Sequence, residues 1–212
     1  MKQIYVQYGC GLSAPEQWIN FDSSPTLQIQ KLGFIGSLLK KRLNTVFPSN
    51  VKYGNIISGL PVEAGSCDGI YCSHVLEHLS LADFRKALTN TYKILKPGGI
   101  FRCVVPDLEY AARTYIDSLD KGDSQASIKF CGPDTLLGVE KRPKGTKGFI
   151  ISFLSNSHHL WMWDSTSLSE ELVNAGFKNV RPCKFNDSGD PMFTLVEDEG
   201  RFIHAVALEC RK

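Results

Sequence analysis

The sequence has no marked excess of charge: among its 212 residues, 24 Lys and Arg stand against 22 Asp and Glu, for a net charge of +2. Proteins that hold nucleic acid present a clear surplus of basic residues, so this balance predicts no nucleic-acid partner. The sequence also lacks an apolar run long enough to cross a membrane, and no signal-peptide pattern precedes the first strand-like segment. We therefore expect a cytoplasmic protein with no membrane insertion.

The seven cysteines lack the spacing of a metal site or of a disulfide framework. Their number is odd, no two are arranged as CxxC, and several lie inside apolar runs. A cysteine in such a run is usually a small buried hydrophobe. The pattern predicts a reducing, intracellular environment and no cysteine-bound metal.

Short β-rich runs are present along the chain, and helical patterns separate them. The early runs are residues 3–8, 18–21, 51–56, 69–73 and 100–105. Strands that alternate with helices predict an α/β fold in which helices cover both faces of a parallel sheet. Two late runs, residues 180–185 and 202–210, are joined by a reversing loop and predict an antiparallel addition at one edge of the sheet.

The helix signals differ in strength. Apolar residues recur at helical spacing over residues 32–46, and residues 108–119 continue the alternation with another helix. The clearest signal is a capping-box pattern at Ser80, which predicts a helix that begins there. A second capping-box pattern at Ser167 predicts a short helix that ends at Gly176.

Residues 121–148 interrupt this alternation. They are rich in Gly, Pro, Lys and Ser and end in a basic run. A segment of this kind inside a compact domain is usually a functional loop or a disordered one. We predict a single domain over residues 1–212, with residues 121–148 as a lid over the site. The basic residues that would suit an acceptor with phosphate or carboxylate, or form a solvated loop, are Lys141, Arg142, Lys144 and Lys147.

Polar or glycine residues follow four of the predicted strands. In chain order these are Gly9 and Gly11, Asp22, Asn55, and Ser73 with His74. Ligands of open α/β sheets bind at the carboxyl ends of the strands, where the strand order reverses. The glycines let the backbone approach a ligand closely, the Asp22 carboxylate can accept from both hydroxyls of a ribose, and the Asn55 amide can pair with an adenine edge.

These residues lie within a longer series of motifs. GCG, WINFD, SHVLEHL and LKPGG occur in that order, and the chain resembles a class I S-adenosylmethionine-dependent methyltransferase of the type 11 family from about residue 4 to 108 and again at 158–177. The resemblance implies a Rossmann-like, doubly wound sheet of seven strands, mostly parallel with an antiparallel C-terminal edge. It implies S-adenosylmethionine as cofactor. The cofactor-binding residues that it implies are Gly9, Cys10, Gly11, Asp22, Ser23, Asn55, Ile56, Ser73 and His74.

The sequence departs from the family pattern at two positions. Only nine residues, Leu12 to Asn20, separate the glycine turn from the end of the second strand, close to the minimum for a parallel crossover. We therefore expect the first crossover helix to be stunted or absent, so that the methionine carboxylate loses a helix N-terminus as its partner. The second departure is Asn55, where relatives often carry Asp.

The resemblance implies methyl transfer to a small-molecule or sugar acceptor, and we expect the methyl to be placed on oxygen. An oxygen acceptor needs a base, and His74 and His158 are the candidate catalytic residues. His158 belongs to a cluster with His159, Trp161 and Trp163. This cluster is interpreted either as a core patch anchored by tryptophan or as a wall of the acceptor site.

Other functions are compatible with parts of the same sequence. The short crossover leaves open a methyltransferase-like protein that binds without turnover. The Tyr92-x-x-x-Lys96 spacing occurs in nicotinamide-dependent reductases. His74-Val75-Leu76-Glu77-His78 matches the HxxEH pattern of zinc peptidases. Because no third ligand is evident and a new helix cap follows at Ser80, we expect no metal.

Overall fold

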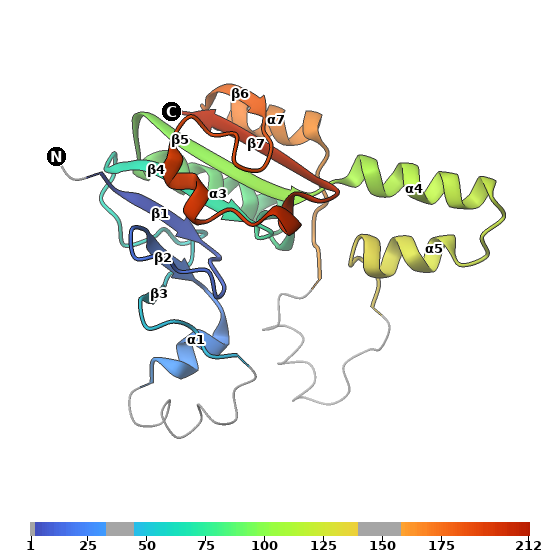
Figure 1. The fold of residues 1–212 in the computed structure, drawn as a ribbon, viewed down its shortest axis with the longest axis horizontal. Coiled ribbons are helices and arrows are strands. Elements are labelled where there is room, and N and C mark those ends of the chain that lie inside the picture. Colours follow the sequence, from blue (N-terminus) through green and yellow to red (C-terminus); the bar gives the residue numbers. More distant parts are fainter. Residues whose placement is uncertain (1–2, 33–44, 140–157) are drawn as a thin grey trace.

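The computed structural model describes residues 3–32, 45–139 and 158–212. Its seven strands form one sheet in the order β3-β2-β1-β4-β5-β7-β6. They are β1 (Tyr5–Tyr8), β2 (Ile19–Asp22), β3 (Val51–Tyr53), β4 (Cys67–Ser73), β5 (Leu95–Pro106), β6 (Lys178–Pro182) and β7 (Ala205–Arg211). The first five strands are parallel, and β7 is antiparallel to both β5 and β6. The predicted α/β architecture with an antiparallel C-terminal edge is confirmed (Figure 1).

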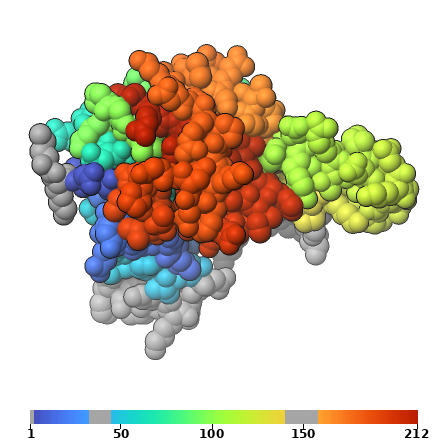
Figure 2. Space-filling view, turned by 45° about the horizontal axis from the view of Figure 1, so that its top comes forward, coloured from blue at the N-terminus to red at the C-terminus, as the bar shows by residue number. Residues whose placement is uncertain are grey.

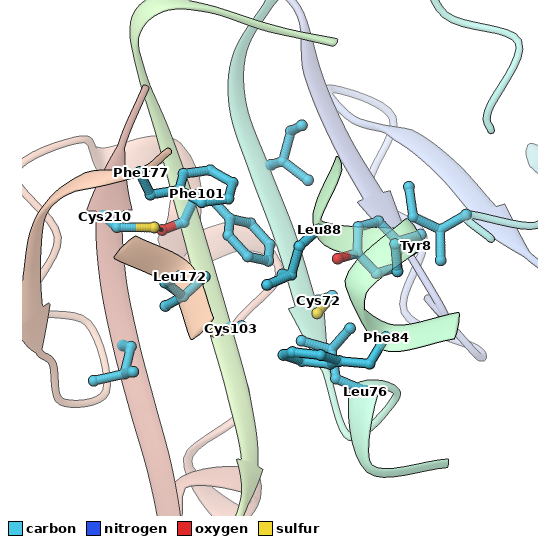
Figure 3. Close-up of a cluster of buried hydrophobic side chains, with 14 of the residues drawn as sticks. Tyr8, Cys72, Leu76, Phe84, Leu88, Phe101, Cys103, Leu172, Phe177 and Cys210 are labelled. Carbon is cyan, nitrogen blue, oxygen red and sulfur yellow. Dashed lines mark hydrogen bonds between the residues drawn. The ribbon is translucent and has the colours of Figure 1, made fainter. Parts of the chain in front are cut away.

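The larger core lies on the face of the sheet that α3 (Leu81–Ile94) and α7 (Ser165–Asn174) cover. Phe84 and Leu88 of α3 pack there with Leu172 of α7, and all three are fully buried (Figure 3). The cysteines Cys72, Cys103 and Cys210 fill the spaces between these side chains as buried free thiols. They are small core residues, as their apolar surroundings in the sequence predict.

Among the described residues, no long helix covers the opposite face of the sheet. A short 3-10 helix, Pro191–Leu195, places Phe193 against Trp18, with ring centroids 5.4 Å apart, and Trp18 also contacts Tyr5 at 5.2 Å. In the space-filling view the C-terminal segments, coloured orange to red, spread over this face (Figure 2). Aromatic side chains bury enough area to cover a sheet without a regular helix.

The crossover from β1 to β2 contains no helix among its described residues, as its length predicts. Two buried amides hold it instead. Gln7 donates to the Ser13 carbonyl and to the Asn20 side chain, and Asn20 donates to the carbonyls of Pro15 and Trp18. These bonds satisfy backbone oxygens that a helix would otherwise pair.

The three long helices of the described residues, α3, α4 (Leu108–Asp120) and α7, begin at side-chain caps. Ser80 caps α3, and Asp107 caps α4 by accepting from the Glu109 amide at 2.8 Å. The prediction for α7 is displaced by three residues: Asp164 is the N-cap and Ser167 is the third helical residue of the capping box. Asp164 accepts from the Ser167 amide at 2.8 Å, so the carboxylate holds the position expected for the hydroxyl. A short helix, α1 (Pro25–Gln30), follows β2, and most of the helix predicted over residues 32–46 lies outside the described residues.

The described part of the predicted lid, residues 121–139, is folded rather than irregular. It contains α5 (Ala126–Lys129) and a π-helical turn (Phe130–Asp134), and Tyr115 of α4 contacts Phe130 at 5.3 Å between ring centroids. Together α4 and α5 form an arm that stands out from the body of the protein (Figures 1 and 2). The four basic residues of the predicted lid lie outside the described residues. No helix in the described ranges combines the length and apolarity that a membrane crossing requires.

Candidate active site

The first part of the site is the turn after β1, which hydrogen bonds connect to the carboxyl end of β2. Asp22 is 8% exposed, and its carboxylate accepts from the backbone amides of Gly11, at 3.0 Å, and Ser24, at 2.7 Å. These bonds fix the carboxylate at the end of β2. A carboxylate has about four lone-pair sites, so two remain for a ligand.

The two glycines of the turn have different roles. Gly9 has a φ of +65°, and a Cβ added to it would lie 2.2 Å from Cγ2 of Val75. Gly11 has a φ of +55°, and a Cβ there would meet nothing within 4 Å. Gly9 is therefore required by packing against the segment after β4, whereas Gly11 leaves open space in front of the backbone. Cys10, between them, is buried, and burial raises the pKa of its thiol to about 12.

The other predicted cofactor residues occupy varied positions. The Asn55 side-chain oxygen accepts from the Ile57 amide at 2.8 Å, which leaves its NH₂ group to face a ligand. Ile56 is 5% exposed and packs in the core, while Ser23 is exposed. Ser73, at the end of β4, is buried, and its hydroxyl has no hydrogen-bond partner among the described residues.

His74 stands at the carboxyl end of β4 in an unusual conformation. Its φ is +54°, and its Nε2 lies 2.9 Å from the Arg201 carbonyl oxygen. A carbonyl can only accept, so Nε2 carries the proton and Nδ1 of the neutral ring keeps a free lone pair. Burial lowers the pKa of His74, which favours this neutral form. A left-handed non-glycine residue of this kind is held by its surroundings and is frequent at functional sites.

A cavity of about 470 Å³ opens beside His74, at the carboxyl ends of β4 and β5. Its size is suited to a small molecule. Polar groups on its wall come from five parts of the chain: His74, Asp107 with Tyr110, Asp134, His159 and His204. The Tyr110 and His204 rings are stacked, with centroids 3.9 Å apart, and the Tyr110 hydroxyl lies 3.2 Å from His204 Nε2.

A buried arginine anchors the loop that carries part of this wall. Arg102 of β5 is fully buried and forms ion pairs with Glu197, at 2.6 Å, and Glu209, at 2.7 Å. Glu197 precedes the segment that supplies the Arg201 carbonyl and His204. The ion pair with Glu197 therefore holds in place the segment that follows it, whose Arg201 carbonyl bonds to His74 and whose His204 lines the cavity. Loss of either carboxylate would leave the buried Arg102 charge without that partner.

The two adjacent histidines predicted as a cluster face different ways. The Glu77 carbonyl oxygen accepts from the amides of Leu160, at 2.8 Å, and Trp161, at 3.1 Å, and so holds this segment next to the end of β4. His159 is 8% exposed and belongs to the cavity wall. His158 points its Nδ1 towards the Leu136 carbonyl oxygen, 3.3 Å away, and is not among the residues of the wall.

Trp163 supports the core interpretation of the same cluster. It is buried and packs against Phe84 of α3, with ring centroids 4.2 Å apart, while Trp161 is 42% exposed. The cluster is thus divided: Trp163 belongs to the core and His159 to the cavity. Hydrophobic periodicity in the sequence could not distinguish the core tryptophan from the cavity histidine, because this segment has no regular secondary structure.

The sequence analysis did not assign a role to Glu77, which the structure places at the centre of the histidines. Glu77 is fully buried, neither carboxyl oxygen has a hydrogen-bond partner among the described residues, and burial raises its pKa to about 8. Its Oε1 lies 3.5 Å from His74 Nδ1, 3.8 Å from His78 Nε2 and 4.0 Å from His159 Nε2. The HxxEH pattern was the signal in the sequence that could have drawn attention to it.

A family model described as a methyltransferase domain matches residues 14–181, which is most of the chain. The chain belongs to this methyltransferase family. The sequence-based recognition is confirmed: the protein is a class I methyltransferase, and S-adenosylmethionine is its methyl donor.

Solved methyltransferase structures share the fold at low sequence identity. A methyltransferase of Thermotoga maritima, described as a possible histamine N-methyltransferase, is 17% identical with a TM-score of 0.50, over 100% of this chain and 83% of that one. Phosphoethanolamine N-methyltransferase 2 of Haemonchus contortus, bound to phosphomonomethylethanolamine and S-adenosylhomocysteine, is 11% identical with a TM-score of 0.51, over 100% of this chain and 49% of that one. No curated protein matches the chain.

The residues that suggested a reductase have structural roles in this methyltransferase. The Tyr92 ring contacts Phe177 at 5.2 Å between ring centroids, and Lys96 forms an ion pair with Asp68 at 2.8 Å. Neither Tyr92 nor Lys96 belongs to the wall of the cavity beside His74. The Tyr-Lys spacing therefore reflects packing at the end of α3.

Proposed function

We propose that this methyltransferase transfers the methyl group of S-adenosylmethionine to a hydroxyl oxygen of a small molecule or sugar held in the cavity beside His74. The observation that carries the proposal is the position of His74. It follows β4, next to the glycine turn of β1 on one side, and it lines the cavity on the other. A methyl group between the two regions would face both the cofactor and the acceptor.

In this proposal the cofactor lies across the ends of β1, β2 and β3. Asp22 accepts from the ribose hydroxyls with its two remaining lone-pair sites, and Gly11 offers open space for close approach. The free NH₂ group of Asn55 donates to an adenine ring nitrogen, because its oxygen is already bonded to Ile57. Cys10, Ser23, Ile56 and Ser73 complete the predicted border of the cofactor.

The carboxylate of the methionine part has no helix N-terminus to meet, since the β1–β2 crossover contains no helix among its described residues. The candidate donors are the backbone amide of the exposed Leu12 and the Ser73 hydroxyl, which has no partner among the described residues. Charge-assisted hydrogen bonds from such donors would replace the helix dipole.

The protein supplies alignment and proton removal. The sulfonium is intrinsically reactive, so the main requirement is that acceptor oxygen, methyl carbon and sulfur lie in line. His74, neutral and with a free Nδ1 lone pair, is the base that we assign to the acceptor hydroxyl. We do not assign this role to His158, because its ring faces the Leu136 carbonyl.

The wall of the cavity favours an acceptor with several hydroxyl groups. Asp107, Asp134 and His204 offer acceptors, and the Tyr110 hydroxyl can donate or accept. Residues 121–139 supply Asp134 and two neighbouring wall residues. This supports the proposal of one domain in which the segment 121–148 covers the acceptor.

A turnover assay tests the proposal. The purified protein is incubated with S-adenosylmethionine and a panel of sugars, polyols and phenols, and S-adenosylhomocysteine is quantified together with the methylated product. We expect product from at least one hydroxylated acceptor, with the new methyl on oxygen by NMR, and loss of most of the rate in His74→Ala. Methylation only of amine or carbon acceptors in a matched panel would contradict the choice of oxygen.

A further inference from the structure

Three side chains beside the cavity form a donor set for a metal ion. One atom each from Glu77, His78 and His159 lies within 4.8 Å of the other two. In a tetrahedral Zn²⁺ site with nitrogen and oxygen ligands about 2.0–2.2 Å from the ion, two ligand atoms lie about 3.3–3.6 Å apart. Small rotations of the side chains would therefore bring all three atoms onto one ion.

Hydrogen bonds outside the set orient the donors inward. His78 Nδ1 lies 3.1 Å from the His158 carbonyl oxygen, so Nδ1 carries the proton and the Nε2 lone pair faces Glu77. Metal-binding histidines are usually held in this way, with the second ring nitrogen bonded to a carbonyl or carboxylate. The bonds from Leu160 and Trp161 to the Glu77 carbonyl place His159 beside the same carboxylate, with its ring centroid 4.9 Å from that of His78.

Two members of the set, Glu77 and His159, are buried and carry polar atoms without partners among the described residues, while His78 is partly buried. Glu77 is fully buried with both carboxyl oxygens lacking a partner, and His159, 8% exposed, has no hydrogen-bond partner for Nδ1 among the described residues. Buried polar groups without partners are costly, and native proteins rarely retain them without a bound group. The gaps of 3.8 Å and 4.0 Å from Glu77 to the two histidines are too long for hydrogen bonds and suited to an ion between the atoms.

We propose that Glu77, His78 and His159 bind a divalent transition-metal ion, with Zn²⁺ the best match, and that the ion keeps an open coordination position towards the cavity. Two histidines and a glutamate with one open position are the ligands of known catalytic zinc sites. The expectation of no metal considered His74 and His78 as the two ligands of the HxxEH pattern, with no third ligand evident and a new cap at Ser80. The structure brings together a different set, in which Glu77 and His159 lie beside His78.

The ion would bind the acceptor, a role that rests on the proposed function. An acceptor hydroxyl that occupies the open position would lose its proton more easily, because a bound cation stabilises the oxyanion. The proton passes to His74, the oxygen forms a bond to the methyl carbon, and the carbon–sulfur bond breaks. The electron pair of the broken carbon–sulfur bond stays on the sulfur, which becomes the neutral thioether of S-adenosylhomocysteine.

A direct titration tests the site without cofactor or acceptor. The tag-free full-length chain is stripped with a chelator and titrated with Zn²⁺ against a chromophoric competitor, and bound metal is counted by elemental analysis after gel filtration. We expect one Zn²⁺ per chain. Glu77→Gln and His159→Gln should each weaken binding by at least about 100-fold, because each removes a ligand.

His158→Ala is the matched control, because the neighbouring ring faces Leu136 while its backbone carbonyl, which orients His78, is retained. We expect its zinc affinity to be unchanged. Circular dichroism and urea denaturation establish that each variant is folded, and His78→Gln provides a third variant if one of the others is not. Absence of stoichiometric zinc, or equal binding by all folded variants, would overturn the site.

Titration with S-adenosylhomocysteine separates this failure from a failure of the proposed function. The predicted cofactor site shares no ligand with the metal set, so metal-free protein should still bind S-adenosylhomocysteine. Loss of zinc binding with intact cofactor binding and turnover would reject only the metal. Loss of turnover in metal-free protein, with recovery on adding Zn²⁺, would support both.

Discussion

The two halves of the site differ in how their polar groups are satisfied. In the half over β1, β2 and β3, Asp22 and Asn55 are bonded to backbone amides within a few residues of the strand ends. In the half over β4 and β5, Glu77, His159 and Ser73 carry buried polar atoms without partners among the described residues. The polar groups of the first half are thus paired within the fold, whereas several of those in the second half are not paired among the described residues.

The difference follows from the range of the contacts. Turns after β1, β2 and β3 need only short segments, so the cofactor half is held by local hydrogen bonds. The acceptor half combines the end of β4, the start of α4, residues 133–136, residues 158–163 and the loop before β7. We infer that the cofactor half is preorganised by local hydrogen bonds. The acceptor half takes its side chains from loops that are far apart in the sequence, and such loops can change without changing the sheet.

The largest effect is expected at Gly9, where the two halves touch. Gly9→Ala introduces a Cβ at 2.2 Å from Val75 Cγ2 and a left-handed φ of +65°. Together, the strain and the overlap should lower the free energy of unfolding by about 2–5 kcal/mol. Urea denaturation measures this. Gly11→Ala is the matched control, since its added Cβ meets nothing, and it should lose only about 1–2 kcal/mol. Equal losses would show that contact with Val75 does not matter.

Asp22→Ala should weaken the cofactor half alone. It removes a charge-assisted bond to the ribose worth about 1.5–3 kcal/mol, so the dissociation constant for S-adenosylhomocysteine should rise about 10- to 100-fold. Calorimetry measures the affinity. Glu16→Ala removes the same charge from an exposed position on the same crossover and should change it little. An Asp22 variant with unchanged affinity would remove this residue from the site.

Tyr110→Phe should affect the acceptor half alone. It deletes the hydroxyl that lies 3.2 Å from His204 and keeps the stacked ring. A neutral hydrogen bond is worth about 0.5–1.5 kcal/mol, so kcat/KM for the acceptor should fall about 2- to 10-fold while S-adenosylhomocysteine affinity is retained. A fall in cofactor affinity of the same size would show that the halves are not separate.

The smallest change is expected for Asn55→Ala. Loss of one neutral hydrogen bond to adenine should raise the dissociation constant for S-adenosylhomocysteine about 2- to 5-fold. Asn55→Asp sharpens the result: it keeps the bond from the Ile57 amide but replaces the NH₂ donor by an acceptor. If the aspartate variant binds better than the native protein, adenine presents its amino group here and Asn55 does not donate.

The sequence predicted the parts of this molecule that depend on neighbouring residues. All seven strands overlap the predicted β-rich runs, although β5 begins at Leu95, five residues before its run, and the absence of a crossover helix among the described residues follows from the nine residues available. The buried pair of Gln7 and Asn20 that replaces this helix was not foreseen, because two polar residues in strands carry no signal of mutual contact. Asp164 was missed as a cap because Ser167 matched the capping pattern equally well.

The acceptor half was predictable only in part. His74 and the cluster around His158 were recognised as functional candidates, but which histidine faces the cavity depends on the bonds from Leu160 and Trp161 to the Glu77 carbonyl. Such pairings between distant segments leave no periodic pattern. Tyr110 and His204 are separated by most of the second half of the chain, and only the antiparallel pairing of β7 with β5 brings them together.

The central claim is that cofactor and acceptor meet at His74 from opposite sides. A crystal structure of the protein with S-adenosylhomocysteine tests it most directly. We predict that the ribose hydroxyls bond to Asp22, that adenine lies by Asn55, and that the sulfur faces His74 and the cavity lined by Tyr110 and His204. A sulfur atom directed away from this cavity, or adenosine bound elsewhere on the sheet, would contradict the account.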